Sequence, residues 1–185
     1  MGELPQTISS QLVFEGRVFN VRTDCVRYSD GAEHRLDIVE HPGSVVILAS
    51  PQPNRLVLVR QYRHPAKRYL WELPAGTREP GEDPAAGALR ELEEETGYRA
   101  GRISLVGSLL MTPGFCDELM HFFYAEELQA GPQSLDEDER IEVTTVTRET
   151  AWRLVAAGEI ADTKTVLALL WMPSGQGEIG TNFGR

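Results

Sequence analysis

The stretch of residues 76–98, GTREPGEDPAAGALRELEEETGY, constrains the fold more than any other part of the chain. Asp83 can cap a helix, and Pro84 suits the first helical position, where its missing N–H is harmless. The alanines and leucines that follow favour a helix, and Gly97 stands where helices commonly end in a left-handed residue. These signals predict a helix over residues 84–96.

The predicted helix has an apolar face and an acidic face, because side chains three and four residues apart lie one above the other. The apolar face is formed by Ala85, Ala88, Leu89 and Leu92. The acidic face is formed by Glu91, Glu94 and Glu95, with Gly87 leaving room one turn earlier. Two interpretations of the carboxylates are open. They could form a solvated face with Arg90 as an ion-pair partner, or they could surround a hard divalent cation such as Mg2+.

The helix is part of a longer pattern with fixed spacing. The fixed positions are Gly76, Glu82, Arg90, Glu91, Leu92, Glu94, Glu95 and Gly97. This pattern resembles the Nudix box, GX5EX7REUXEEXGU, in which U is usually a bulky aliphatic residue; every fixed position matches, and Tyr98 stands at the last U. The resemblance implies an α/β (α+β) fold, the Nudix fold, in which a mixed β-sheet is sandwiched between α-helices, and it covers residues 42–172.

The rest of the chain alternates between strand and helix patterns. Strands are expected within residues 11–40, with a Ser-Asp-Gly turn, and at 44–49, 55–60, 71–73, 103–110, 118–125 and 141–146. Further helices are expected at 150–157 and 163–172. We therefore expect an N-terminal β-hairpin extension at 1–41, a Nudix hydrolase domain at 42–172 and a flexible tail at 173–185. A hairpin alone would expose apolar strand faces, so we expect a homodimer that buries it.

Charge and cysteine content limit the partners and the compartment. The net charge of -10 repels nucleic-acid backbones, so we expect no nucleic-acid partner. No apolar run approaches the roughly 20 residues of a membrane span, and the start, MGELPQTISS, lacks the features of a secretory signal. The two cysteines, Cys25 and Cys116, do not form a disulfide framework, which favours the reducing cytoplasm.

Three further segments resemble one branch of the Nudix family. They are VRQYRHP at 59–65 followed by WELPAG at 71–76, TPGFCDE at 112–118, and LDEDERIEV at 135–143. Together with the N-terminal strands they look like the ADP-ribose pyrophosphatase branch, in which a proline follows the box at about the distance of Pro113. The resemblance implies Mg2+-dependent hydrolysis of ADP-ribose, a small nucleoside-diphosphate substrate, to AMP and ribose 5-phosphate.

The resemblance also implies metal-binding and catalytic residues. Glu91 and Glu95 match Mg2+ ligands, and Glu94 matches a further ligand or a support for the metal-bound water. The metal site is completed by the backbone carbonyl of Ala75, by Glu82 and, for an extra ion, by Glu139. Arg90 matches the arginine that orients the glutamates, and Glu137 matches the candidate general base. Two or three Mg2+ ions per site are implied, with Mn2+ as an alternative.

Substrate-binding residues are implied in the same way. Arg63 matches an arginine that contacts the diphosphate. The region around the terminal ribose is matched by Gly114, Phe115 and Glu118. The stretch that approaches adenine across a dimer interface in relatives is matched by Arg35 and Leu36. Relatives often carry an aromatic residue there for stacking; Leu36 is not aromatic, and Phe19 or Tyr28 could take its place.

The box alone does not select the substrate, because it handles the diphosphate and not the base. The same chemistry on another nucleoside-diphosphate sugar, such as GDP-mannose, or on a dinucleotide is therefore open. A non-catalytic Nudix module that senses a nucleotide sugar is a further alternative. Loss of box carboxylates would be the expected sign of such a module, and all of them are present in this chain.

Overall fold

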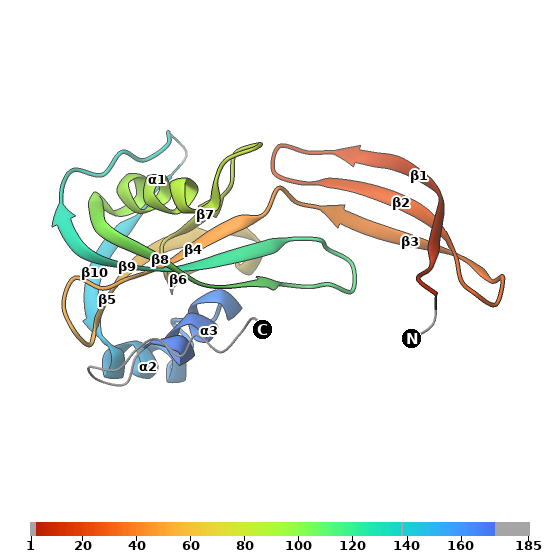
Figure 1. The fold of residues 1–185 in the computed structure, drawn as a ribbon. Coiled ribbons are helices and arrows are strands. Elements are labelled where there is room, and N and C mark those ends of the chain that lie inside the picture. Colours follow the sequence, from red (N-terminus) through yellow and green to blue (C-terminus); the bar gives the residue numbers. More distant parts are fainter. Residues whose placement is uncertain (1–2, 138, 173–185) are drawn as a thin grey trace. The chain divides into compact units, whose positions relative to one another are not determined.

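The computed structural model describes residues 3–137 and 139–172, so the predicted tail at 173–185 lies outside the described residues. The chain forms two compact units. The first consists of the chain up to Ser44 and the segment Leu109–Met120. The second consists of Val45–Ser108 and the chain from His121 onward. Figure 1 shows the course of the ribbon through both units.

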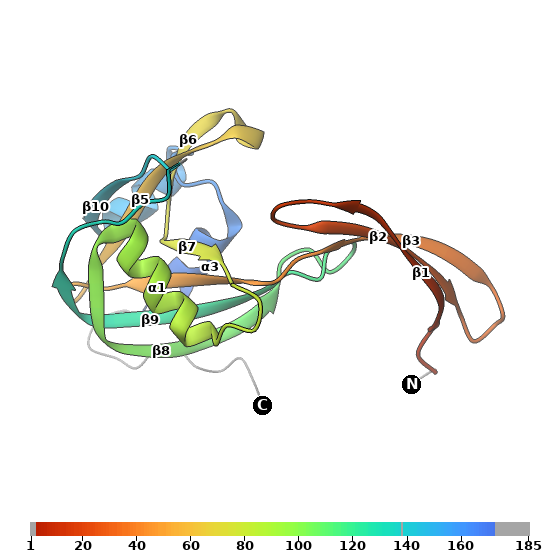
Figure 2. The ribbon, with the colours of Figure 1, turned by 90° about the horizontal axis from the view of Figure 1, so that it is seen from above.

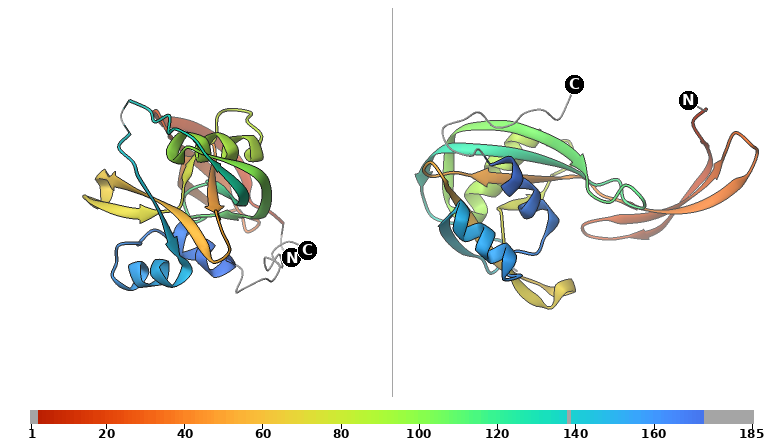
Figure 3. Two further views of the ribbon diagram at one scale, coloured as in Figure 1. Left: turned by 90° about the vertical axis from the view of Figure 1, so that its left-hand side faces the viewer. Right: turned by 90° about the horizontal axis from the view of Figure 1, so that it is seen from below.

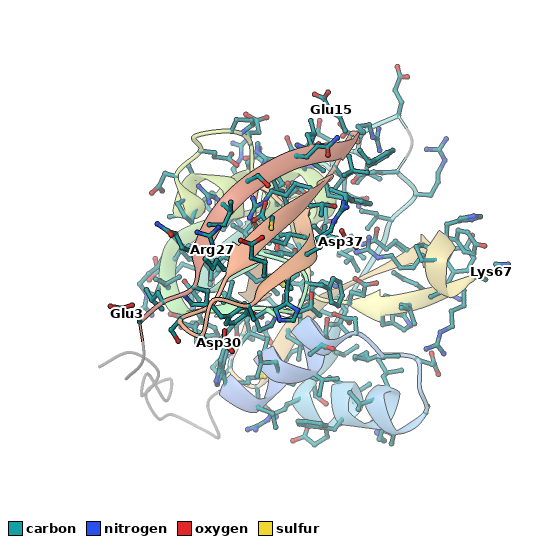
Figure 4. The ribbon with its side chains drawn as sticks, turned by 90° about the vertical axis from the view of Figure 1, so that its right-hand side faces the viewer. Glu3, Glu15, Arg27, Asp30, Asp37 and Lys67 are labelled. Atoms are coloured by element: carbon teal, nitrogen blue, oxygen red, sulfur yellow. The ribbon has the colours of Figure 1, made fainter. Side chains whose placement is uncertain are left out.

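The first unit is built on an antiparallel sheet with the strand order β1-β2-β3. Its strands are β1 (Gln6–Glu15), β2 (Asn20–Arg27) and β3 (Glu33–Glu40). Figure 4 shows this sheet with its side chains, with Glu15 and Arg27 at opposite ends of the β1-β2 pair. The expected hairpin thus has a third strand. Every residue of β1 is exposed, so its sequence lacks the alternation that marks a half-buried strand.

The segment that follows strand β8 (Tyr98–Leu110) and precedes strand β9 (Leu119–Ala130) belongs to the same unit. The backbone N–H of Val39 donates to the carbonyl of Phe115 at 2.8 Å, and the N–H of Asp117 donates to the carbonyl of Val39 at 3.2 Å. These two hydrogen bonds attach the TPGFCDE segment to the end of β3.

The second unit contains two sheets, one with the order β7-β4-β9-β8 and one with the order β10-β5-β6. The remaining strands are β4 (Ser44–Ala49), β5 (Arg55–Arg63), β6 (Arg68–Glu72), β7 (Ala75–Thr77) and β10 (Glu142–Thr147), with the 3-10 turn η1 (His64–Ala66) between β5 and β6. Strand β4 is buried along its whole length, because elements cover both of its faces. Strands β6 and β7 take the place of the single strand expected at 71–73.

Helices lie on both sides of these sheets. Helix α1 (Pro84–Thr96) covers one side, as seen from above in Figure 2, and Ala88 and Leu92 pack in a core cluster with Phe123 of β9. Helices α2 (Arg148–Ala156) and α3 (Thr163–Trp171) cover the other side (Figure 3). There the rings of Phe122 and Trp171 meet edge to face, 5.0 Å apart. Adjacent residues of a strand point to opposite faces, so β9 contacts both helical layers, as the predicted sandwich requires.

The ends of α1 are those predicted from the sequence. The Asp83 side chain accepts hydrogen bonds from the backbone N–H groups of Ala85 and Ala86, both at 3.1 Å. Gly97 ends the helix with a φ of 74°, and a Cβ there would lie 2.3 Å from the carbonyl oxygen of Gly131. Both its conformation and its surroundings therefore require glycine. Among the described residues, no helix is long and apolar enough to cross a membrane.

Candidate active site

Arg90 is the centre of the acidic face of α1. Its guanidinium donates to both carboxylate oxygens of Glu82, at 2.9 and 3.1 Å, and to Glu91 at 2.8 Å and Glu94 at 2.9 Å. The hydrogen bonds from Arg90 are the largest cause of the lowered pKa of Glu82. The arginine thus fixes three predicted site carboxylates with one side chain, because its planar fork holds several donors in fixed directions.

Two glycines make room for these carboxylates. A Cβ at Gly76 would lie 1.9 Å from the carboxylate carbon of Glu91, and a Cβ at Gly87 would lie 2.7 Å from an oxygen of Glu82. Gly76 of β7 and Glu91 of α1, two fixed positions of the box pattern, are therefore in direct contact. The glycine at position 76 is needed because the glutamate carboxylate occupies the space of a side chain.

We expect Gly76→Ala to fold but to lose metal-dependent function. The added methyl group would displace the Glu91 carboxylate, which is the mobile end of a side chain, so the fold has little to lose. Metal affinity should fall by about tenfold or more, as when a group that orients a metal ligand is changed. Calorimetric titration with Mg2+ and a thermal melt check this. Gly114→Ala, where a Cβ meets nothing within 4 Å, is the steric control for the melt. Unchanged Mg2+ affinity in Gly76→Ala would contradict the expectation.

Glu95 is the most buried carboxylate of the helix, with 3% of its surface exposed. It accepts a hydrogen bond from the backbone N–H of Ala75 at 2.9 Å. The pKa of Glu95 is raised to about 8, chiefly by burial. The neighbouring carboxylates of Glu91 and Glu139 contribute to the rise, whereas the hydrogen bond from Ala75 and the charge of Arg63 oppose it. Burial also raises the pKa of Glu91, partly offset by Arg90. Both carboxylates are therefore costly to ionise where they are buried, and a nearby positive charge would favour their ionised forms.

The donor set fits a hard divalent cation. Within residues 3–137 and 139–172, no group of three or more His, Cys, Asp or Glu side chains is arranged to hold an ion, because Arg90 holds Glu91 and Glu94. However, Glu95 has no ion-pair partner in that part of the chain, and it lies within electrostatic reach of two other carboxylates. Carboxylate and carbonyl oxygens are the ligands that Mg2+ prefers, and an added cation would relieve their mutual repulsion.

The raised pKa of Glu95 predicts that metal binding releases a proton. With a pKa of about 8 this carboxyl group is mostly protonated at pH 7, whereas a carboxylate must be deprotonated to bind a cation. Mg2+ affinity should therefore increase as the pH rises from about 6 to 8. Calorimetry in buffers with different ionisation enthalpies counts the released protons, and Glu95→Gln is the control that should release fewer. An affinity independent of pH, with no proton release, would refute the role of Glu95.

The loop between β9 and β10 is fastened to the C-terminal end of α1. The backbone N–H of Ser134 donates to the carbonyl of Glu94 at 3.1 Å, and the side-chain amide of Gln133 donates to the carbonyl of Glu95 at 2.6 Å. Sequence reasoning missed both residues, because no local pattern marks them. The loop brings the charge of Glu139 within reach of Glu95. The Glu137 carboxylate is exposed and makes no hydrogen bond or ion pair with the described residues.

Arg63 lies at the end of β5 and is held by a buried glutamate. Its Nε and Nη2 donate to the two carboxylate oxygens of Glu72, each at 2.8 Å. Lys164, from the first turn of α3, donates to the same carboxylate. Burial alone would raise the pKa of Glu72, but Arg63 and Lys164 together lower it below its usual value. Sequence reasoning named Arg63 but not its two partners.

The other predicted substrate-binding residues, apart from Arg63, lie in the first unit. Arg35 and Leu36 are exposed on β3. Gly114 and Phe115 are exposed in the segment after β8, and Glu118 accepts a hydrogen bond from the hydroxyl of Ser44 at 2.8 Å. Their roles stay predictions.

Known proteins resemble this chain over most of its length. Residues 40–169 match the family model of the NUDIX domain. The chain is 41% identical to an ADP-ribose pyrophosphatase of Bacillus subtilis (strain 168), over 90% of this chain and 91% of that protein. It is 39% identical to a methanol dehydrogenase activator of Bacillus methanolicus, over 93% and 95%. A solved structure of an ADP compounds hydrolase shares the fold, with a TM-score of 0.80 at 23% identity over 92% of each chain.

Sheets between helices, with the box carboxylates on one helix, are the features of the Nudix hydrolases, a class that needs a divalent metal ion. The chain belongs to the NUDIX domain family and is a Nudix hydrolase. The family and the fold predicted from the box are thereby confirmed.

Proposed function

We propose that the protein hydrolyses the diphosphate bond of ADP-ribose to AMP and ribose 5-phosphate with Mg2+ in its site. One observation carries the proposal. Three box carboxylates, those of Glu82, Glu91 and Glu94, pair with Arg90. The buried Glu95 lies within electrostatic reach of Glu91 and has no ion-pair partner among the described residues. The extensive identity with an ADP-ribose pyrophosphatase supports the choice of substrate.

The residues proposed to hold the metal come from α1, β7 and the loop before β10. They are Glu91, Glu94, Glu95, the carbonyl of Ala75, Glu82 and Glu139. Two or three Mg2+ ions would be held, and Mn2+ is the proposed substitute. When bound, such ions neutralise diphosphate oxygens and lower the pKa of a coordinated water. Arg90 keeps the carboxylates in place, which avoids reorganisation during the reaction.

Two side chains are proposed to act on the substrate directly. Glu137 takes the proton of the attacking water, because its carboxylate is exposed on the loop and is not engaged by the described residues. Arg63 contacts the diphosphate, because Glu72 occupies only two of its five N–H donors. The remaining donors suit phosphate oxygens, which arginine binds well.

Recognition of the nucleoside and the ribose is proposed for the residues that the family resemblance implies. The residues concerned are Arg35 and Leu36 for adenine, with Phe19 or Tyr28 for stacking, and Gly114, Phe115 and Glu118 for the terminal ribose. A homodimer is proposed because β1 exposes Leu12 and Phe14, each at 52%. The free thiols of Cys25 and Cys116 support a reducing compartment such as the cytoplasm.

Hydrolysis of a substrate panel tests the proposal. The panel contains ADP-ribose, ADP-glucose, GDP-mannose, NADH and diadenosine polyphosphates, each with Mg2+ and with EDTA. We expect ADP-ribose to be preferred, AMP to appear, and EDTA to abolish the reaction. Preference for GDP-mannose or a dinucleotide would replace the substrate but keep the chemistry. No turnover of any compound would favour a nucleotide-sugar sensor.

A further inference from the structure

A row of four charged side chains runs from the start of α3 to Arg63. Asp162 caps α3 by accepting from the N–H of Thr165 at 3.0 Å, and it also accepts from Lys164 Nζ at 2.8 Å. Lys164 donates in turn to Glu72, whose two oxygens bind Arg63. Charges alternate along the row, from the aspartate at one end to the arginine at the other.

The middle of this row is buried. Glu72 is 1% exposed and Lys164 is 9% exposed. The chain has only two lysines, the other being the exposed Lys67. Desolvation of buried ion pairs often cancels their attraction, and apolar replacements of similar size are commonly as stable. A contribution to stability therefore explains poorly why Glu72 and Lys164 are charged. Their position beside Arg63 points to a functional role.

The positive end of the row lies within electrostatic reach of Glu95, a residue of the predicted metal site. The Arg63 side chain is 39% exposed, and its Nη1 makes no hydrogen bond with the described residues. Its charge reaches Glu95 and opposes the rise in the pKa of that group. Arg63 is thus fixed on one edge by a rigid acceptor and keeps free donors on the other.

The start of α3 also fixes the strand segment that leads to Ala75. The hydroxyl of Thr165 accepts from the backbone N–H of Leu73 at 2.9 Å, next to the contact between Lys164 and Glu72. Two residues further on, Ala75 donates to Glu95. A single helical turn therefore holds both the arginine and the backbone beside the carboxylates.

We propose that Lys164 and Glu72 are positioning residues that orient Arg63 toward a bound diphosphate. Glu72 fixes the guanidinium in a bidentate pair. Lys164 shares the charge of Glu72, so that Arg63 is not its only counter-ion and keeps positive charge for phosphate oxygens. This role rests on the proposed function, because it assumes a diphosphate in the site.

A double-mutant cycle on diphosphate affinity tests this. Binding of inorganic diphosphate is measured by calorimetry at fixed Mg2+ for the wild type, Lys164→Met, Arg63→Ala and the double variant. We expect each single change to weaken binding by about tenfold or more, as for a lost hydrogen bond to a charged group. The double variant should bind no more weakly than Arg63→Ala, because Lys164 acts through Arg63.

Two variants separate positioning from general damage. Lys67→Met is the matched control, since it removes the exposed lysine, and it should bind as the wild type does. Glu72→Gln keeps the side-chain volume and removes the charge that holds Arg63, so it should also weaken diphosphate binding. It replaces Lys164→Met as the test if that variant does not fold. Thermal melts accompany every variant.

The outcomes keep this inference apart from the proposed function. If the loss of affinity in the double variant equals the product of the losses in the two single variants, the positioning role is overturned even if ADP-ribose is hydrolysed. Wild-type affinity in both Lys164→Met and Glu72→Gln would overturn it as well. If the double variant binds diphosphate no more weakly than Arg63→Ala but the protein does not hydrolyse ADP-ribose, the positioning role is sustained and that substrate is refuted. A wild type that binds no diphosphate would overturn the positioning role, while the substrate panel alone decides the proposed function.

Discussion

Glu91→Gln and Glu95→Gln are each expected to lower the rate of diphosphate hydrolysis by about a thousandfold or more, even at saturating Mg2+. Metal ions contribute several kcal/mol of charge stabilisation to such reactions, and about 1.4 kcal/mol is a factor of ten in rate. Glutamine keeps the size of the side chain but removes the charge that attracts the ion. Initial rates over a Mg2+ titration measure the loss.

The fold should survive the change at Glu95. Its pKa is raised in the folded protein, so the folded state binds more protons than the unfolded state between the ordinary carboxyl pKa and about 8. Stability of the metal-free protein therefore decreases as the pH rises through this range. Glutamine resembles the protonated acid, so Glu95→Gln should melt no lower than the wild type at pH 7 and should show a flatter pH dependence.

Glu93→Gln is the matched control on the same helix. Glu93 points away from the acidic face and pairs with the exposed Arg99 at 2.6 Å, and exposed pairs contribute little. Its rate should stay within about twofold of the wild type. Wild-type rates in Glu91→Gln and Glu95→Gln would mean that the metal is held elsewhere.

The helix and its carboxylates could be predicted because their signals are local. Asp83 and Gly97 mark the two ends of α1 within a few residues of the backbone groups that they satisfy. The helical repeat alone places Glu91 beside Glu94 and Glu95. The prediction that a glycine leaves room in front of the acidic face also rests on this repeat, and Gly87 does lie against Glu82.

The supports of the site could not be predicted, because they join residues far apart in the sequence. Lys164 and Glu72 are 92 positions apart, and Gln133 reaches Glu95 across 38 positions. No periodicity links such pairs, and a buried lysine looks like a surface lysine in the sequence. The predicted strand region begins at residue 11, whereas β1 begins at Gln6. The reason is that both faces of β1 are exposed, so its sequence has no apolar alternation.

Glu137→Gln is expected to reduce hydrolysis by about 10²- to 10⁴-fold, the usual contribution of a general base. The Glu137 carboxylate is exposed and free of hydrogen bonds to the described residues, so its replacement should leave the thermal melt unchanged. The metal affinity should also be unchanged, since the metal is assigned to other carboxylates. The rate constant at saturating substrate and Mg2+ is the measurement.

Glu139→Gln distinguishes a base from a metal ligand on the same loop. Glu139 lies within electrostatic reach of Glu91 and Glu95, so its loss should weaken metal binding, and added Mg2+ should restore part of the rate. Added Mg2+ should not restore Glu137→Gln, because a missing proton acceptor is not replaced by more metal. A loss below about tenfold in Glu137→Gln, or its recovery at high Mg2+, would assign the base to another residue.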